Sequence, residues 1–305
     1  MAAMIVASLL IGAASMSVSL DDPRSVMLLL ESRIPRTLAV LLTGAALAVA
    51  GVVMQQIVQN RFVGPDTVGT SESAALGLLL VTIYLPTMPI WGKMLCASLS
   101  ALAGTALFVQ IARRIPPHNF MMVPLVGIIF AGVVQSVVSF IAWQTDLVQY
   151  IGIWLMTGEF SGVLAGRYEM LWIAGIGAAL SWFVADQFAI LGLGREASTG
   201  LGLNYDRIVR LGLIVVAVTT AMIVATVGAI PFIGLIVPNI VVRFMGDNLR
   251  RSIPVIAWFG ACLTLACDLL ARTIRPPFEI PVGSILGVIG AAIFLVLLYR
   301  RRRYV

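Results

Sequence analysis

Few side chains in this sequence have the types and spacing that chemistry needs. The single lysine, Lys93, is followed by Met94, whereas a phosphate-binding loop needs Ser or Thr there to hold magnesium. The single histidine, His118, has no Cys, Ser or carboxylate near it in the sequence to act with it. The segment 192–197 imitates a dinucleotide-binding turn but follows an apolar helix rather than a strand. We therefore predict no catalytic residue, no metal site and no bound cofactor.

Polar side chains inside apolar stretches form a second group with functional potential. A charge buried in hydrocarbon is costly, so Glu72 and Asp268 need a partner arginine or access to water, or they belong to an ion pathway. Four neighbouring polar residues end another apolar stretch: Gln55, Gln56, Gln59 and Asn60. They either line an internal path or bond neighbouring helices, and both interpretations stay open.

The composition indicates that these side chains belong to a chain that lies mainly in lipid. Of the 305 residues, 60% are hydrophobic and 11% charged, and the mean hydropathy is +1.03. A soluble protein has about 25% charged residues. The net charge of +6 comes from arginines in short polar gaps rather than on one amphipathic face, which argues against nucleic-acid binding. The cysteines lie in apolar runs, as small buried hydrophobes do.

Apolar stretches of spanning length, about 20 residues, recur along the whole chain. They predict an all-α integral membrane protein with about ten transmembrane helices in a single domain, residues 1–305. The stretch 211–242 contains helix-breaking prolines and is too long for one helix, so we expect two helices joined by a buried turn. The short stretch 147–158 is expected to be an interfacial or re-entrant helix. The expected spans are 1–18, 37–58, 72–86, 92–112, 121–143, 169–190, 208–229, 233–246, 252–272 and 282–299.

Arginine also indicates the orientation of these spans, because short loops rich in Arg stay in the cytoplasm. The strongest basic group is the C-terminal run Arg300-Arg301-Arg302-Arg303. An even number of spans places both termini on that side, and most other basic residues then fall in cytoplasmic gaps. We therefore predict that both termini are cytoplasmic.

Several motifs follow one another in a fixed order. Arg33-Ile34-Pro35-Arg36-Thr37-Leu38-Ala39 precedes Asn60-Arg61-Phe62-Val63-Gly64-Pro65-Asp66-Thr67-Val68-Gly69-Thr70. Later come Trp154-Leu155-Met156, Gly228-Ala229-Ile230-Pro231-Phe232-Ile233-Gly234-Leu235-Ile236-Val237-Pro238, and Glu279-Ile280-Pro281-Val282-Gly283. Together these motifs resemble the permeases of iron-chelate and cobalamin ABC importers. Residues 60–70 have the form seen in the catecholate-siderophore branch, and Asn239 argues against cobalamin.

This resemblance implies a type II ABC importer permease in the bacterial cytoplasmic membrane. Such a permease pairs with a second permease subunit, identical or paralogous, around a central path. Two cytoplasmic ATPase subunits would hold ATP-Mg, and an extracytoplasmic siderophore-binding protein would deliver a ferric siderophore. The chain would move this cargo rather than catalyse a reaction. An ion-coupled secondary transporter of a small solute is the alternative, and an integral membrane enzyme lacks support because His, Asp and Glu do not gather at a bilayer edge.

The resemblance also assigns residues to partners. Arg33, Arg36 and Arg272 match outward-facing arginines that bind acidic residues of the binding protein, a role suited to the fixed donor fork of arginine. Contact with lipid phosphate is the alternative. The segment 193–206 matches the coupling segment whose short helix lies in a groove of the ATPase, with an ordinary cytoplasmic loop as the alternative. Its expected contact residues are Arg195, Glu196, Ala197, Gly200, Leu201 and Gly202. The expected path or gate residues are Gln55, Gln56, Gln59, Asn60, Phe232, Gly234, Pro238 and Asn239.

Overall fold

The computed structural model describes residues 1–11, 23–115, 122–148, 158–166, 168–275 and 278–301, and helices dominate this described part. His118, the motif Trp154-Leu155-Met156 and most of the expected helix 147–158 lie outside the described residues. The predicted all-α fold is confirmed, and every expected span contains a helix.

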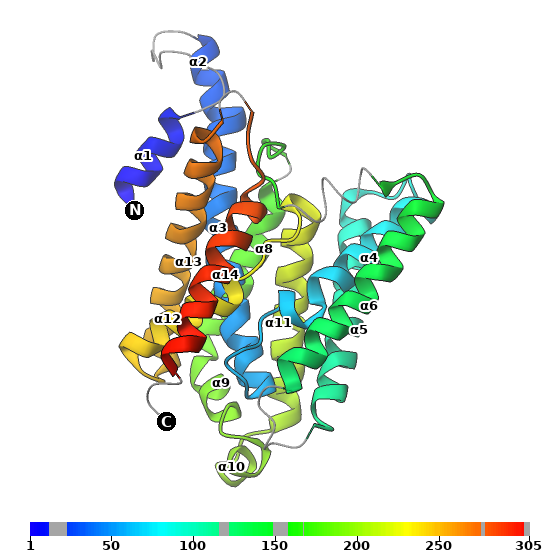
Figure 1. The fold of residues 1–305 in the computed structure, drawn as a ribbon, viewed down its shortest axis with the longest axis vertical. Coiled ribbons are helices and arrows are strands. Elements are labelled where there is room, and N and C mark those ends of the chain that lie inside the picture. Colours follow the sequence, from blue (N-terminus) through cyan, green and yellow to red (C-terminus); the bar gives the residue numbers. More distant parts are fainter. Residues whose placement is uncertain (12–22, 116–121, 149–157, 167, 276–277, 302–305) are drawn as a thin grey trace.

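The central helix is α3 (Ile34–Val58), which contacts α8, α11, α12 and α13. It continues from α2 (Pro23–Leu28) and η1 (Leu29–Arg33), and within this continuous helix the stretch Val26–Val58, 33 residues, is long enough to cross a bilayer. Its partner α13 (Leu249–Thr273) runs alongside it (Figure 1). A Cβ atom on Gly44 would lie 2.5 Å from the carbonyl oxygen of Gly260, so only glycine permits this approach of the two backbones.

A second group of helices lies on one side of the bundle (Figure 1). It consists of α4 (Thr70–Tyr84), α5 (Ile90–Ala112) and α6 (Met122–Gln144), and α11 (Tyr205–Val227) packs between α5 and α3. Hydroxyl groups join α4 to α5: the Thr70 and Thr105 oxygens lie 2.8 Å apart, and Ser100 donates to the carbonyl of Ser73 at 2.6 Å. Such hydrogen bonds help to hold helices together in lipid, where the hydrophobic effect that joins helices in a soluble protein is absent.

Shorter helices complete the bundle. They are α1 (Ala2–Leu10), η2 (Asp66–Val68), η4 (Tyr168–Met170), α8 (Leu171–Phe183), α9 (Ala185–Leu191), α10 (Arg195–Gly200), α12 (Ile233–Met245) and α14 (Val282–Arg301). The expected span 169–190 is bent by 70° between α8 and α9. The turn predicted within 211–242 is confirmed: α11 ends at Val227 and α12 begins at Ile233, with Gly228 and Phe232 both at positive φ.

Five helices in the described residues are long and apolar enough to cross a membrane alone, or six if the bent pair α8 and α9 is one span. The helices α4, α12 and α14 are apolar but shorter. The helix α12 is short because residues 228–232 form the turn before it and therefore do not lengthen the helix. The main core surrounds α3, α11 and α13, and a smaller one joins α4, α5, α6 and α11.

Candidate functional site

Three places in the fold gather most of the side chains that the sequence singled out, together with two acidic neighbours, Asp66 and Glu279. We call the first the arginine cluster: Arg33, Arg36, Asp268, Arg272 and Glu279. The second is the α12 junction at the other end of α3: Gln55, Asn60, Asp66, Phe232, Gly234 and Asn239. The third is the α10 loop, residues 193–206. Figure 1 shows that the arginine cluster, at the start of α3 and the end of α13, and the α10 loop lie at opposite ends of the bundle.

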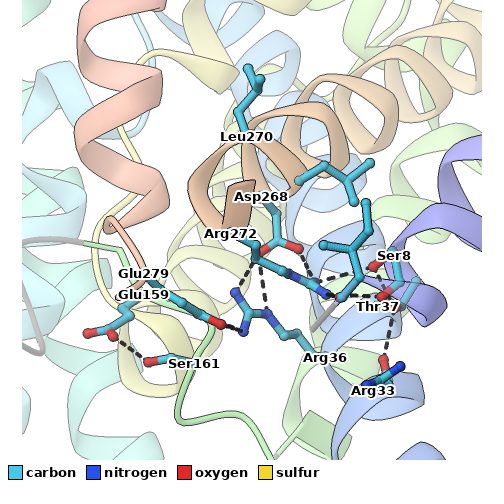
Figure 2. Close-up of polar contacts among 12 residues, drawn as sticks. Ser8, Arg33, Arg36, Thr37, Glu159, Ser161, Asp268, Leu270, Arg272 and Glu279 are labelled. Carbon is cyan, nitrogen blue, oxygen red and sulfur yellow. Dashed lines mark hydrogen bonds and ion pairs between the residues drawn. The ribbon is translucent and has the colours of Figure 1, made fainter. Parts of the chain in front are cut away.

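Two arginines and two carboxylates bind one another in the arginine cluster (Figure 2). Arg36 Nη2 donates to Oδ1 of Asp268 at 2.8 Å, and Arg36 Nη1 lies 2.7 Å from Oε2 of Glu279. Arg272 Nη2 donates to the second carboxylate oxygen of Asp268. Asp268 is fully buried, while Arg36 and Arg272 are 9% and 6% exposed. The charges of these side chains balance, which is the condition for burying them together.

The arginine cluster also holds α1 against the bundle. The backbone carbonyls of Ser8–Ile11 all accept hydrogen bonds from arginine: the first and last from Arg272 Nη1 at 3.0 and 3.1 Å, and the two between from Arg33 Nη1 at 2.7 and 3.1 Å. These are the carbonyls at the C-terminal end of α1, where the helix itself offers no hydrogen-bond donor. A cation at this end is stabilised by the negative end of the helix dipole. Arg33 and Arg272 therefore have a structural role in addition to any role toward a partner.

The predicted docking arginines thus lie close together, but most of their described hydrogen bonds go to acceptors within this chain. Asp268 has a partner arginine, which is one of the alternatives that the sequence left open. Glu279 lies in one of the sequence motifs but is not among the site residues expected from the sequence, and its side chain is 17% exposed, compared with 0% for Asp268. The docking role of Arg33, Arg36 and Arg272 stays a prediction, and it has to account for these internal carboxylates.

Glu72, the other acid expected inside an apolar stretch, lies in the first turn of α4. Its Oε2 is buried and has no hydrogen-bond partner among the described residues. A carboxylate at this end of a helix faces the positive end of the helix dipole. The dipole of α4 is the stabilising influence that the fold offers this side chain.

The α12 junction contains five of the eight predicted path and gate residues, and two of them, Gln55 and Gly234, contact each other. Gln55 Nε2 lies 3.5 Å from the carbonyl oxygen of Gly234, and Asn239 Nδ2 donates to the carbonyl of Arg61 at 2.6 Å. A Cβ atom on Gly51 would overlap the backbone of Gly234, so α3 and α12 touch directly. For Gln55 these contacts favour the interpretation that the polar side chain bonds neighbouring helices.

The other predicted path residues occupy different environments at the same end of α3. Gln59 ends α3 in the left-handed region with φ 54° and is exposed, and Asn60 is buried and accepts from the backbone N–H of Phe62 at 2.8 Å. Gln56 is half-buried, and Pro238 is buried inside α12. Their assignment to a path or gate stays a prediction.

Asp66 is a residue of the α12 junction that the sequence reasoning did not single out. It lies in the connection between α3 and α4, and its Oδ2 accepts from the backbone N–H of Phe232 at 2.8 Å. Burial raises the pKa of Asp66, and hydrogen bonds from backbone N–H groups, that of Phe232 first, act in the opposite direction. The contact fixes the turn that leads into α12. The sequence feature that could have pointed to Asp66 is its position directly after Gly64-Pro65.

The α10 loop is a short helix held from within. Ser198 is buried, and its Oγ lies 2.8 and 2.6 Å from the carbonyl oxygens of Ile190 and Gly194. Gly194 and Gly202 bracket the helix at φ 100° and 81°, values that favour glycine. These contacts fix the turns on both sides of α10.

The outer surface of the α10 loop is open and carries two exposed leucines beside its charged residues. Leu193 and Leu201 are 65% and 64% exposed, and nothing lies within 4 Å of the position that a Cβ on Gly200 would occupy. Arg195 binds Asp206 at 3.1 Å and lies 5.7 Å from the ring centre of Tyr205. A projecting, internally anchored helix with exposed leucines has the form of an element that lies in the groove of another protein. Its coupling role stays a prediction.

The fold and these clusters define a polytopic α-helical membrane protein of the transport class. A family model described as the FecCD transport family matches residues 1–300, and the chain belongs to this family. The resemblance drawn from the motifs is therefore confirmed. The chain is a permease component of an ABC importer and not an enzyme.

Named relatives and a solved structure agree with this assignment. The chain is 42% identical over 276 residues to the petrobactin import system permease protein YclN of Bacillus subtilis, covering 90% of this chain and 87% of that protein. It is 37% identical to the ferric-anguibactin transport system permease protein FatD of Vibrio anguillarum, covering 89% and 86%. A metal-chelate type ABC transporter solved in an inward-facing conformation superposes with a TM-score of 0.83 at 26% identity, covering 98% and 96%.

Proposed function

We propose that this chain is the permease subunit of an ATP-driven importer that moves a ferric siderophore of the catecholate type across the bacterial cytoplasmic membrane. The observation that carries the proposal is the 42% identity, over 90% of the chain, to a permease named for petrobactin import. Family membership and the similarity to a ferric-anguibactin permease support it. Siderophore choice would rest mainly on the binding protein that delivers the cargo.

The energy for transport would come from two cytoplasmic ATPase subunits that hold ATP-Mg. The sequence supports this division, because Met94 follows the single lysine and no phosphate-binding loop can be drawn around it. The α10 loop would lie in a groove of the ATPase and contact it through six residues: Arg195, Glu196, Ala197, Gly200, Leu201 and Gly202. The exposed leucines and the open space at Gly200 support this role.

Delivery of the siderophore would take place at the other end of the bundle. An extracytoplasmic binding protein would dock there through acidic residues that meet Arg33, Arg36 and Arg272. The position of the arginine cluster opposite the α10 loop supports this arrangement (Figure 1). The arrangement also requires the α10 loop and both termini to be cytoplasmic.

A second permease subunit, identical or paralogous, would complete the path. Residues 1–305 would act as one membrane domain, with the coupling segment 193–206 within it, and the α12 junction would border the path or its gate. Large apolar side chains on α5, α6 and α14 are exposed in the single chain, including Leu99, Phe140 and Val288, and they would face lipid or the second subunit.

The test is uptake of iron-loaded siderophore into proteoliposomes that contain this chain, its ATPase and its binding protein. ATP-dependent uptake is expected, and an ATPase variant unable to hydrolyse ATP is the control. Uptake that continues without ATP and collapses with the ion gradient would instead favour the ion-coupled secondary transporter. Family membership already argues against that alternative.

A further inference from the structure

Glu279 occupies an unusual position in the arginine cluster. It lies on the short connection between α13 and α14, whereas Asp268 lies within α13. Both oxygens of the Glu279 carboxylate meet the same nitrogen, Nη1 of Arg36, at 2.9 and 2.7 Å (Figure 2). This contact is at the rim of the cluster, because Glu279 retains 17% exposure of its side chain.

Asp268 and Glu279 bind different nitrogens of the Arg36 guanidinium. Asp268 Oδ1 accepts from Nε at 3.3 Å and from Nη2 at 2.8 Å, so the inner edge of the fork stays fixed whatever happens at Nη1. Because the donors of arginine have fixed directions, the contacts with Asp268 leave Nη1 of Arg36 pointing toward the rim of the cluster. Another carboxylate can therefore replace Glu279 without leaving Arg36 unpaired or turning its side chain.

We propose that Glu279 is an internal latch that stands in for a carboxylate of the binding protein. In the free permease Glu279 neutralises Arg36. On docking, an acidic side chain of the binding protein takes its place at Nη1, and Glu279 moves into solvent. This inference rests on the proposed docking function, and it explains how an arginine that is only 9% exposed can bind a partner.

Release of Glu279 removes one of the contacts that hold the segment before α14. Just beyond Glu279, the backbone N–H of Ile280 donates to the carbonyl of Ala271 at 3.2 Å, and that of Gly283 donates to Gly158 at 3.0 Å. Further along α14, a Cβ atom on Gly290 would lie 2.6 Å from Cβ of Phe232, so α14 touches the α12 junction. The latch thus connects the docking face with a candidate gate through α14.

The test compares the affinity of the binding protein for three forms of the permease in nanodiscs. Glu279→Gln removes the competing charge with little change in shape, and we expect docking about tenfold tighter than for the wild type. Glu159→Gln is the matched control, because Glu159 is a neighbouring acid whose carboxylate accepts from the hydroxyl of Ser161 (Figure 2). Its docking should equal that of the wild type.

Unchanged or weaker docking of Glu279→Gln, while the wild type binds, would overturn the latch and leave the proposed docking function intact. A wild type that does not bind the protein would overturn the docking function itself. Glu279→Ala also removes the carboxylate and must tighten docking, so it replaces the first variant if Glu279→Gln does not assemble. Equal tightening by Glu159→Gln would mean that any lost negative charge on this face suffices, and that too would reject the latch.

Discussion

Asp268 is the single residue on which the arginine cluster depends, because its two oxygens bind two different buried arginines. In Asp268→Asn, Arg272 loses its carboxylate partner and Arg36 keeps only Glu279. A buried charge left without its partner typically costs about 3–5 kcal/mol, so we expect a large loss of stability, measured as thermal unfolding in detergent.

Asp186→Asn is the control for this prediction. Asp186 binds Arg250 at 2.6 Å, but both side chains are 59% exposed, and an exposed ion pair contributes about 1 kcal/mol or less. The two variants should therefore differ clearly. Similar small losses in both would show that the arginines of the cluster find other partners.

At this scale the sequence singled out Arg36 and Asp268 but could not show that they bind each other. Arg36 and Asp268 are 232 residues apart, and nothing in either local pattern says that they touch. The motifs contain Asp66 and Glu279, but a carboxylate in a loop acquires meaning only from the donor it meets. For these two residues the donors are the N–H of Phe232 and the guanidinium of Arg36, both distant in the chain.

Glycines determine how closely the helices approach. Gly51→Ala would place a methyl group on the backbone of Gly234, whereas Gly132→Ala on α6 meets nothing within 4 Å. Overpacking of this kind costs about 1–3 kcal/mol, so we expect Gly51→Ala to lower the unfolding temperature. Gly132→Ala should leave it unchanged or raise it, because alanine favours a helix. Equal melting of the two variants would contradict the close contact of α3 with α12.

The α10 loop makes a separate prediction about coupling. Leu201→Glu places a charge on a residue that is 64% exposed, so the fold should survive while an apolar contact with the ATPase is lost. We expect weaker ATPase binding and loss of transport at unchanged permease stability, measured by co-purification and uptake. Leu85→Glu, at a residue 51% exposed in the connection before α5, is the control and should behave like the wild type. ATPase binding that survives Leu201→Glu would remove Leu201 from the interface.

Elements could be predicted from the sequence where local physics decides them. Hydropathy located a helix within each expected span, and the prolines and glycines of 228–238 located the turn before α12. The 70° bend between α8 and α9 could not be predicted, because Val184 at the bend is neither proline nor glycine. Contacts from α13 accompany it: Trp182 donates to the carbonyl of Arg250 at 3.0 Å, and Arg250 binds Asp186.

For the whole molecule, the proposed orientation can be tested by labelling. In a variant whose cysteines 96, 262 and 267 are replaced by alanine, a cysteine at exposed Ser161 should react with a membrane-impermeant maleimide from outside spheroplasts. A cysteine at exposed Thr199 should react only after the membrane is opened. The arginine excess at the α10 end is the physical reason for this expectation. The reverse labelling pattern would invert the molecule and place the arginine cluster in the cytoplasm.

The glycine contacts of α3 have a mechanical consequence for the transport cycle. Backbones that touch, as α3 does at Gly260 of α13 and at Gly234 of α12, cannot slide without collision, and the arginine cluster adds a second fixed point. These three helices therefore behave as one stiff lever. Bending and sliding during transport must then be taken up outside these three helices, and α14 is the helix that we expect to move. Probes on α3 and α13 should keep a constant separation while probes on α14 move.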